Sequence, residues 1–536
     1  MRLSSGWTPE RLPTFDLFMV HPGYRKRIII LLIGLLLVRF WFAQTFELSG
    51  PEAYLWQMGE NLSPAYWGHG PFVPWLIRLG TIFYGNTELG VRGPAAVIAC
   101  LSGFALFFQA RHWFTARAGF WTVVLFTIVP MFAWKLSFMT EATASIGLMA
   151  VAMVGFCRAV EEDKFGWWLL GGIACGFALL VAIANAWWLV GLILYFVVNP
   201  ERRVHLREPL LWSALIISVL FLLPVIWWWH GAQVADIRHT HILNAWPLSH
   251  RLSLNDGFHF VWLEIWYLCP FFFALLVYIV WRLRGHLWSD ARYGMLISLA
   301  VPGLIWQNFS AFFQEGNFEM VPALMLPLVL LVGCSVARLT HADKTGRWVY
   351  AVVFAFAALQ SLAGLNPFYL FAKSDGQGYQ FRRMVSGDNV TGFEESKREL
   401  SWRNFADEIQ RMQADQGATL LITDNPNTAA ALSFYLPHNP FVYVESRSDL
   451  ITHFDFWTQY DESASPNDSA LFITRTNEPP PPDLFRDFTT VTEIDDPPLP
   501  EFDRTWNIWS CKNFRGTGQP TTGRSAPLPE SDALPK

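Results

Sequence analysis

The sequence predicts an all-α polytopic membrane domain of about eleven transmembrane helices, followed by a small water-soluble α/β domain. Hydrophobic residues make up 52% of the 536 positions and charged residues only 15%, against about 25% charged in an average soluble domain. Apolar runs of about 18 to 22 residues recur through the first two thirds, and a helix of that length crosses the hydrocarbon core. After Asn366 the charge rises and no further run of this kind occurs.

Each apolar run is predicted to be a helix, because backbone groups inside lipid must be hydrogen-bonded within their own segment. The predicted spans are 27–46, 92–110, 118–134, 141–157, 166–182, 184–199, 209–229, 259–281, 293–312, 319–337 and 347–365. Lys and Arg recur in alternate connections, from Arg25 through Arg347, and are sparse in the others. Short cytoplasmic loops hold such an excess, so the N-terminus is predicted to be cytoplasmic and the chain after residue 366 periplasmic.

Four segments follow from this pattern. The predicted organisation is a cytoplasmic N-terminus (1–26), a transmembrane domain (27–366) with a large first external loop (47–91), a periplasmic α/β domain (367–515) and a disordered tail (516–536). Within the α/β domain, the periodicity predicts a helix over 401–414, a second helix between Asn427 and Tyr435, and strands at Thr419–Ile422, Phe441–Val444, Leu471–Thr474 and Thr505–Trp509.

Charge and cysteine content exclude some classes of protein. A formal net charge of −5 gives no basic face for nucleic acid. The six cysteines are scattered, five of them in or near apolar runs, so we interpret them as buried hydrophobic side chains rather than a disulfide or metal framework.

Several aromatic and acidic segments follow one another in an order that resembles a known family. The segments are 48–56 (Leu-Ser-Gly-Pro-Glu-Ala-Tyr-Leu-Trp), 66–71 (Tyr-Trp-Gly-His-Gly-Pro), 138–142 (Phe-Met-Thr-Glu-Ala), 314–318 (Gln-Glu-Gly-Asn-Phe) and, near the C-terminus, 511–514 (Cys-Lys-Asn-Phe). This order is similar to that of the GT-C membrane glycosyltransferases, in particular bacterial lipid A aminoarabinose transferases and the protein O-mannosyltransferase-like group. The resemblance extends over nearly the whole chain.

The resemblance implies an inverting transfer of a sugar from a polyprenyl-phosphate carrier to an acceptor hydroxyl, at the periplasmic face of a bacterial inner membrane. The acceptor would be an envelope glycolipid, a glycan or a protein. No cofactor is implied with certainty. A divalent metal stays open, because His69, His239 and His241 could converge with nearby carboxylates, but no metal site is predicted from residues so far apart in sequence.

The same resemblance names candidate site residues. Glu52 or Glu141 would take the acceptor's proton, and the predicted substrate contacts are Tyr54, His69, Arg238, His239, Glu315 and Asn317. Two positions depart from the family's pattern, since Pro51 stands where relatives usually have Asp and His69 where they have a phosphate-binding Lys. A neutral imidazole still donates one hydrogen bond, but it is fully charged only below a pKa of about 6.5.

Each candidate also has a structural explanation. Glu52 and Glu141 could cap helix N-termini, Glu315 and Asn317 could end helices, and Arg238 and His239 could face lipid headgroups. Two other functions remain open at this point. One is a transporter or flippase for the same lipid carrier, although the sequence shows no internal repeat. The other is a catalytically degenerate homologue that keeps the fold as a scaffold.

Overall fold

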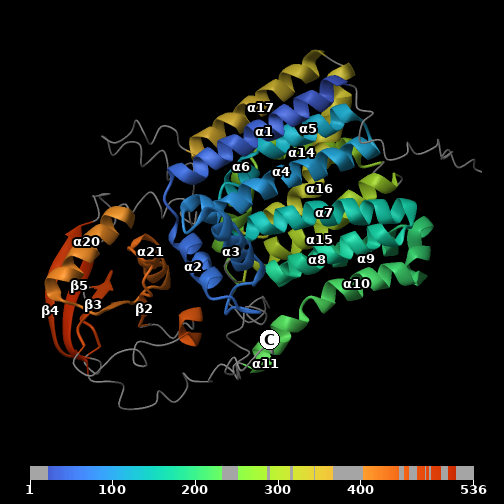
Figure 1. The fold of residues 1–536 in the computed structure, drawn as a ribbon. Coiled ribbons are helices and arrows are strands. Elements are labelled where there is room, and N and C mark those ends of the chain that lie inside the picture. Colours follow the sequence, from blue (N-terminus) through green and yellow to red (C-terminus); the bar gives the residue numbers. More distant parts are fainter. Residues whose placement is uncertain are drawn as a thin grey trace, which may run out of the picture.

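The computed structural model describes residues 22–231, 252–285, 290–313, 318–342, 344–365, 402–445, 452–457, 468–476, 478–481, 485–495 and 505–514. These residues form a helical bundle with a small β-sheet beside one end of it (Figure 1). The predicted contacts Arg238, His239, Glu315 and Asn317 lie outside the described residues.

Helices account for the whole of the described N-terminal part. They are α1 (Pro22–Thr45), α2 (Gly50–Glu60), α3 (Phe72–Tyr84), α4 (Glu88–Trp113), α5 (Ala116–Ile128), α6 (Pro130–Lys135), α7 (Glu141–Glu162), α8 (Phe165–Val181), η1 (Ile183–Ala186), α9 (Trp187–Val198), η2 (Pro200–Arg207), α10 (Pro209–Leu220), α11 (Leu223–Gly231), α13 (Leu254–Tyr267), α14 (Pro270–Leu283), α15 (Ala291–Ser310), α16 (Val321–Ala342) and α17 (Lys344–Leu365). Helix α16 lies at the centre, because every residue from Val321 to Ala337 is buried.

The outer helices of the bundle expose apolar side chains. On α1, Ile30 is 70% exposed and Leu37 63%, and on α11 Trp227 is 64% exposed. An apolar surface of this kind suits contact with lipid. By length and composition, four helices of the described residues could cross a membrane: α1 from Lys26, α4, α7 and the run Pro209–His230. The total of eleven spans stays a prediction.

One predicted span is bent in the structure. The run 259–281 forms two helices, α13 and α14, which meet at 93°. Pro270 at the start of α14 has no N–H for the α13 ladder, and Cys269 before it has a φ of +68°. The run is therefore not one continuous helix, because the proline ends the first helix.

The C-terminal part is a five-stranded sheet with two helices. Its helices are α20 (Trp402–Gln416) and α21 (Pro426–Tyr435), with a short 3-10 helix η6 (His453–Phe456), and its strands are β1 (Leu420–Thr423), β2 (Tyr443–Val444), β3 (Ala470–Thr474), β4 (Phe485–Asp495) and β5 (Thr505–Phe514). The order is β2-β1-β3-β5-β4, parallel in β2-β1-β3 and antiparallel in β3-β5-β4. Helices and strands match the predicted segments, except that β4 was not predicted.

The sheet domain contacts the bundle through the first loop. Helix α21 lies beside α2 (Figure 1), and the Phe434 ring packs edge-on against Trp56 with 4.9 Å between centroids. The Tyr435 hydroxyl accepts a hydrogen bond from the Leu48 N–H at 2.7 Å. Arg403 of α20 forms an ion pair with Glu88 of α4. Apolar packing and polar contacts therefore join the two parts.

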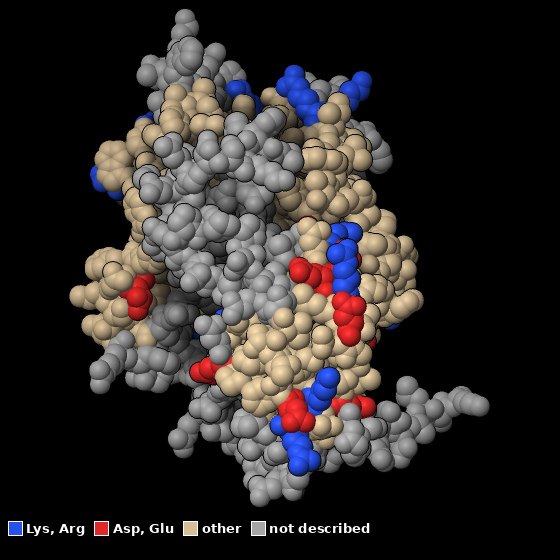
Figure 2. All heavy atoms as spheres, turned by 90° about the vertical axis from the view of Figure 1, so that its left-hand side faces the viewer, with Lys and Arg blue, Asp and Glu red and all other residues tan. Residues whose placement is uncertain are grey.

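The face of the molecule on the side of the sheet carries charge of both signs. Figure 2 shows Lys and Arg beside Asp and Glu on the right and lower parts of this face, and Lys and Arg without acidic neighbours along its upper edge. Among the residues described on this face there is no broad basic surface.

Candidate functional site

Glu52 is a buried structural carboxylate at the start of α2. Its side chain forms a capping box with Ser49, whose hydroxyl donates to Glu52 Oε2 at 3.0 Å. Arg92 of α4 donates from Nε to Oε1 at 2.8 Å and from Nη2 to Oε2 at 2.5 Å, and the Met139 N–H donates to Oε1 at 3.3 Å. Only 1% of either side chain, Glu52 or Arg92, is exposed. Both oxygens are thus engaged with protein groups.

Arg92 also binds the backbone where the first loop begins. Its guanidinium donates to the Phe46 carbonyl at 2.6 Å and to the Glu47 carbonyl at 2.8 Å. The Glu52–Arg92 pair therefore fixes three segments to one another: the end of α1, the start of α2 and the approach to α7. No role was predicted for Arg92, although its place at the start of the predicted span 92–110 marks it as an ion that needs a partner.

The pair of His69 and Glu141 is more accessible to solvent than the pair of Glu52 and Arg92. His69 Nδ1 lies 2.9 Å from Glu141 Oε1, with 34% and 17% of the two side chains exposed. Glu141 is the first residue of α7, where a carboxylate is stabilised by the helix dipole. His69 lies in a turn of the first loop, between Gly68 with a φ of +78° and Gly70. The structure thus brings together two residues 72 positions apart.

Lys135 and Glu319 form a second ion pair beside Glu141. Lys135 ends α6 and contacts Glu319, which lies just before α16. Glu319 Oε2 also accepts a hydrogen bond from the Ala142 N–H at 3.3 Å, and so caps α7 next to Glu141. Burial alone would raise the pKa of Glu319, but Lys135 and the hydrogen bonds hold it below its ordinary value. The sequence analysis missed both residues, although Lys135 is one of few basic residues in the predicted external connections.

Tyr54 lies between the pair and the C-terminal domain. Its ring meets His69 edge-on at 5.7 Å and stacks on Phe454 of η6 at 5.7 Å. Its hydroxyl accepts a hydrogen bond from the His453 N–H at 2.9 Å. The predicted substrate contact is therefore also an interdomain contact, and His453 is a neighbour of the site that sequence reasoning missed.

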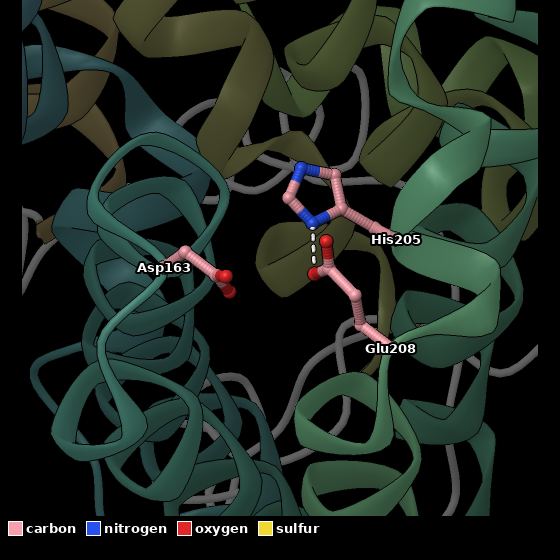
Figure 3. Close-up of side chains that lie close together, drawn as sticks. All are labelled: Asp163, His205 and Glu208. Carbon is pink, nitrogen blue, oxygen red and sulfur yellow. Dashed lines mark hydrogen bonds and ion pairs between the residues drawn. The ribbon is translucent and has the colours of Figure 1, made fainter.

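A group of potential metal ligands occurs elsewhere in the bundle. Asp163, His205 and Glu208 place one ligand atom each within 4.8 Å of one another, and Figure 3 shows His205 facing Glu208 with Asp163 across from them. The atoms already have protein partners, since His205 Nδ1 lies 2.6 Å from Glu208 and Asp163 accepts from Trp168. Asp163 follows the far end of α7, a helix of 22 residues, which puts the group about 30 Å from Glu141.

The arrangement around Glu141 can support proton transfer next to a cation. A carboxylate with an imidazole partner can take a proton from a hydroxyl, and an ammonium group can stabilise negative charge on a departing phosphate. Glu52 lacks access to solvent, whereas His69, Glu141 and Lys135 are each partly exposed.

Comparison with known proteins finds a family profile and individual proteins that resemble this chain. Residues 68–228 match the profile of the dolichyl-phosphate-mannose-protein mannosyltransferase family, a segment that holds His69, Lys135 and Glu141. A curated relative, lipid A galacturonosyltransferase RgtD of Rhizobium johnstonii, is 23% identical over 388 residues, covering 72% of this chain and 77% of the relative. The crystal structure of ArnT from Cupriavidus metallidurans bound to undecaprenyl phosphate superposes with a TM-score of 0.60 at 16% identity, covering 92% of this chain and 98% of ArnT. The apo form of ArnT gives 0.58.

The chain has the fold of the GT-C membrane glycosyltransferases and resembles those that modify lipid A. The resemblance seen in the sequence motifs is thereby confirmed, over nearly the full length of the solved relative. Glu52 lies outside the matched family segment, and the His69–Glu141 pair lies inside it.

Proposed function

We propose that this protein is an inverting glycosyltransferase that moves a sugar from a polyprenyl-phosphate carrier to an acceptor hydroxyl. The observation that carries the proposal is the His69–Glu141 pair, next to Lys135, in a chain that resembles enzymes of lipid A modification. The acceptor we favour is an envelope glycolipid of lipid A type, and the site opens at the periplasmic face of the inner membrane.

In this reaction the bond between the anomeric carbon and the carrier phosphate breaks as the acceptor oxygen attacks from the opposite side. The acceptor hydroxyl loses its proton to the His69–Glu141 pair, with Glu141 as the base and His69 as the group that orients it. Glu52 does not serve as the base, because both its oxygens accept hydrogen bonds from Ser49, Arg92 and Met139 inside the protein.

The leaving group is the carrier phosphate, which gains negative charge as the glycosyl bond breaks. Lys135 is the basic residue that the described part of the chain places next to Glu141, and 18% of its side chain is exposed. Its pair with Glu319 fixes the ammonium group at the start of α7, so it is in place before the donor arrives. We assign to Lys135 the contact that His69 was predicted to make.

The proposal is tested with purified protein, radiolabelled polyprenyl-phosphate sugars and lipid A acceptor. Glu141→Gln and His69→Gln are expected to lower transfer at least a hundredfold. A matched control exists in the same helix, because Glu161 near the other end of α7 pairs with His112 at 2.7 Å with similar exposure. Glu161→Gln removes an equivalent ion pair and is expected to leave transfer within about threefold of wild type.

Two outcomes would contradict the proposal. Equal loss in Glu141→Gln and Glu161→Gln would mean that the effect comes from disturbing α7 rather than from chemistry. No transfer by the wild type from any polyprenyl-phosphate sugar would rule out the enzyme, and would favour a transporter or a scaffold.

A further inference from the structure

The turn that carries His69 is held tightly on one side by the membrane domain. Tyr66 and His69 pair across it in an isolated antiparallel bridge, and Gly68 adopts a left-handed conformation. A Cβ on Gly70 would lie 2.0 Å from the Leu180 carbonyl oxygen, at the end of α8. The turn therefore lies directly against the backbone of α8, with no room for a side chain.

On its other side the turn meets His453 of the C-terminal domain. The Trp67 N–H donates a hydrogen bond to His453 Nδ1 at 3.0 Å. Only 2% of His453 is exposed, and its ring lies 4.9 Å from the rings of Tyr66 and Trp457. Because Nδ1 accepts this bond, the imidazole has to be unprotonated at that nitrogen.

The same histidine, His453, also contacts Tyr54, whose ring lies against His69. Its backbone N–H donates to the Tyr54 hydroxyl at 2.9 Å. The Tyr54 ring is fixed between Phe454 on one face and the edge of His69. One residue of η6 thus contacts both the turn before His69 and the aromatic ring beside it.

We infer that His453 is a positioning residue of the transfer reaction, which clamps the turn 66–69 so that His69 meets Glu141. The inference rests on the proposed function. It gives the C-terminal domain a part in the chemistry, since a residue more than 380 positions from His69 completes the support of its turn.

The surroundings of His453 keep it in the form that this role needs. Burial, and to a smaller extent the nearby His69, lowers the pKa of His453 to about 3. Among the residues that the structure describes, Tyr54, Tyr66 and His69 are titratable groups that face it, while Trp228 and Trp457 are neutral. At neutral pH the ring is therefore uncharged and Nδ1 is available to Trp67.

Hydrogen exchange tests the clamp without any measurement of transfer. We expect the Trp67 amide to exchange at least tenfold faster in His453→Phe, which keeps an aromatic ring but has no acceptor. In His453→Asn the Oδ1 atom takes the place of Nδ1, and protection should return to within threefold of wild type. Tyr435→Phe is the matched control, because it removes a different interdomain contact, to Leu48, and should leave Trp67 protected.

Transfer kinetics then test the consequence. The kcat of His453→Phe should fall at least tenfold with little change in the KM for donor, and His453→Asn should recover most of it. Unchanged exchange in His453→Phe, or failure of His453→Asn to restore protection, would overturn the inference. A wild type that transfers no sugar would overturn the proposed function, and the exchange experiment would still decide whether His453 holds the turn.

Discussion

Removing the charge of Glu52 should unfold or loosen the protein rather than alter its chemistry. Glu52 and Arg92 are each only 1% exposed and form two hydrogen bonds with each other, at 2.8 and 2.5 Å. In Glu52→Gln the guanidinium of Arg92 would stay buried without a counter-ion. Breaking one partner of a buried pair costs about 3–5 kcal/mol, which corresponds to a change of about two to four powers of ten in the folding equilibrium constant.

The companion variants separate the charge effect from the loss of contacts. Arg92→Met should cost a similar amount, because it leaves the Glu52 carboxylate buried and unpaired. The double variant Glu52→Gln with Arg92→Met removes both charges, so it should be less destabilised than the sum of the single variants. The half-life of the folded protein in detergent at a fixed elevated temperature ranks the variants by their rate of unfolding, and this measurement does not require reversible unfolding.

The alternative reading of Glu52 predicts the opposite pattern. If Glu52 were the catalytic base, Glu52→Gln would keep the wild-type half-life and lose only sugar transfer. That result would refute the structural role argued for Glu52 and would identify Glu52, in the first loop, as the catalytic base. Equal destabilisation by Glu141→Gln would be equally damaging, since Glu141 is predicted to matter for chemistry alone.

Three further predictions concern the turn and its surroundings. Lys135→Met should lower transfer at least tenfold and weaken binding of the polyprenyl-phosphate donor. Lys135→Arg should keep part of the transfer activity and part of the donor affinity. An unchanged donor affinity in Lys135→Met would refute the role of Lys135 at the leaving group. Docking of the C-terminal domain should weaken as the pH falls below about 6.5, because an undocked His453 binds a proton there while the docked one, with a pKa of about 3, does not. The loss of docking free energy is about 2 kcal/mol at pH 5 and absent above pH 6.5. Exchange of the Trp67 amide that is independent of pH, after correction for intrinsic rates, would refute this prediction. Gly70→Ala should displace the turn from Leu180 and abolish most transfer, whereas Gly166→Ala, in open space, should behave as wild type; a fully active Gly70→Ala would show that the close contact does not matter.

The helices and most strands could be predicted because their signals are local. Apolar runs long enough to span a membrane identify the bundle, and short β-branched runs identify β1, β3 and β5. The strand β4 was missed because Phe485–Asp495 carries Arg, Asp and several Thr at the edge of the sheet, so it lacks an apolar run. The 93° bend between α13 and α14 was missed because the apolar run continues through Pro270.

The candidate site was only partly predictable for a different reason. Glu141 and His69 are in motifs that a reader of the sequence can find, but their pairing joins residues from the first loop and α7. Arg92, Glu319 and His453 were assigned no role from the sequence, and each becomes significant only through its partner in space. A residue such as Glu52 also shows how a motif position can hold a structural role, because burial and hydrogen bonding are invisible in the sequence.

The sequence resemblance implies a lysine at the position of His69, and the structure gives a reason why a lysine should not stand there. In His69→Lys an ammonium group would form a permanent ion pair with Glu141 and compete for the carboxylate that takes the acceptor's proton. It would also place a second full charge near Lys135 and beside the buried, uncharged His453. We therefore expect His69→Lys to lower transfer at least tenfold without weakening the binding of polyprenyl phosphate. Faster transfer by this variant would mean that position 69 contacts the carrier phosphate directly, and that Lys135 does not.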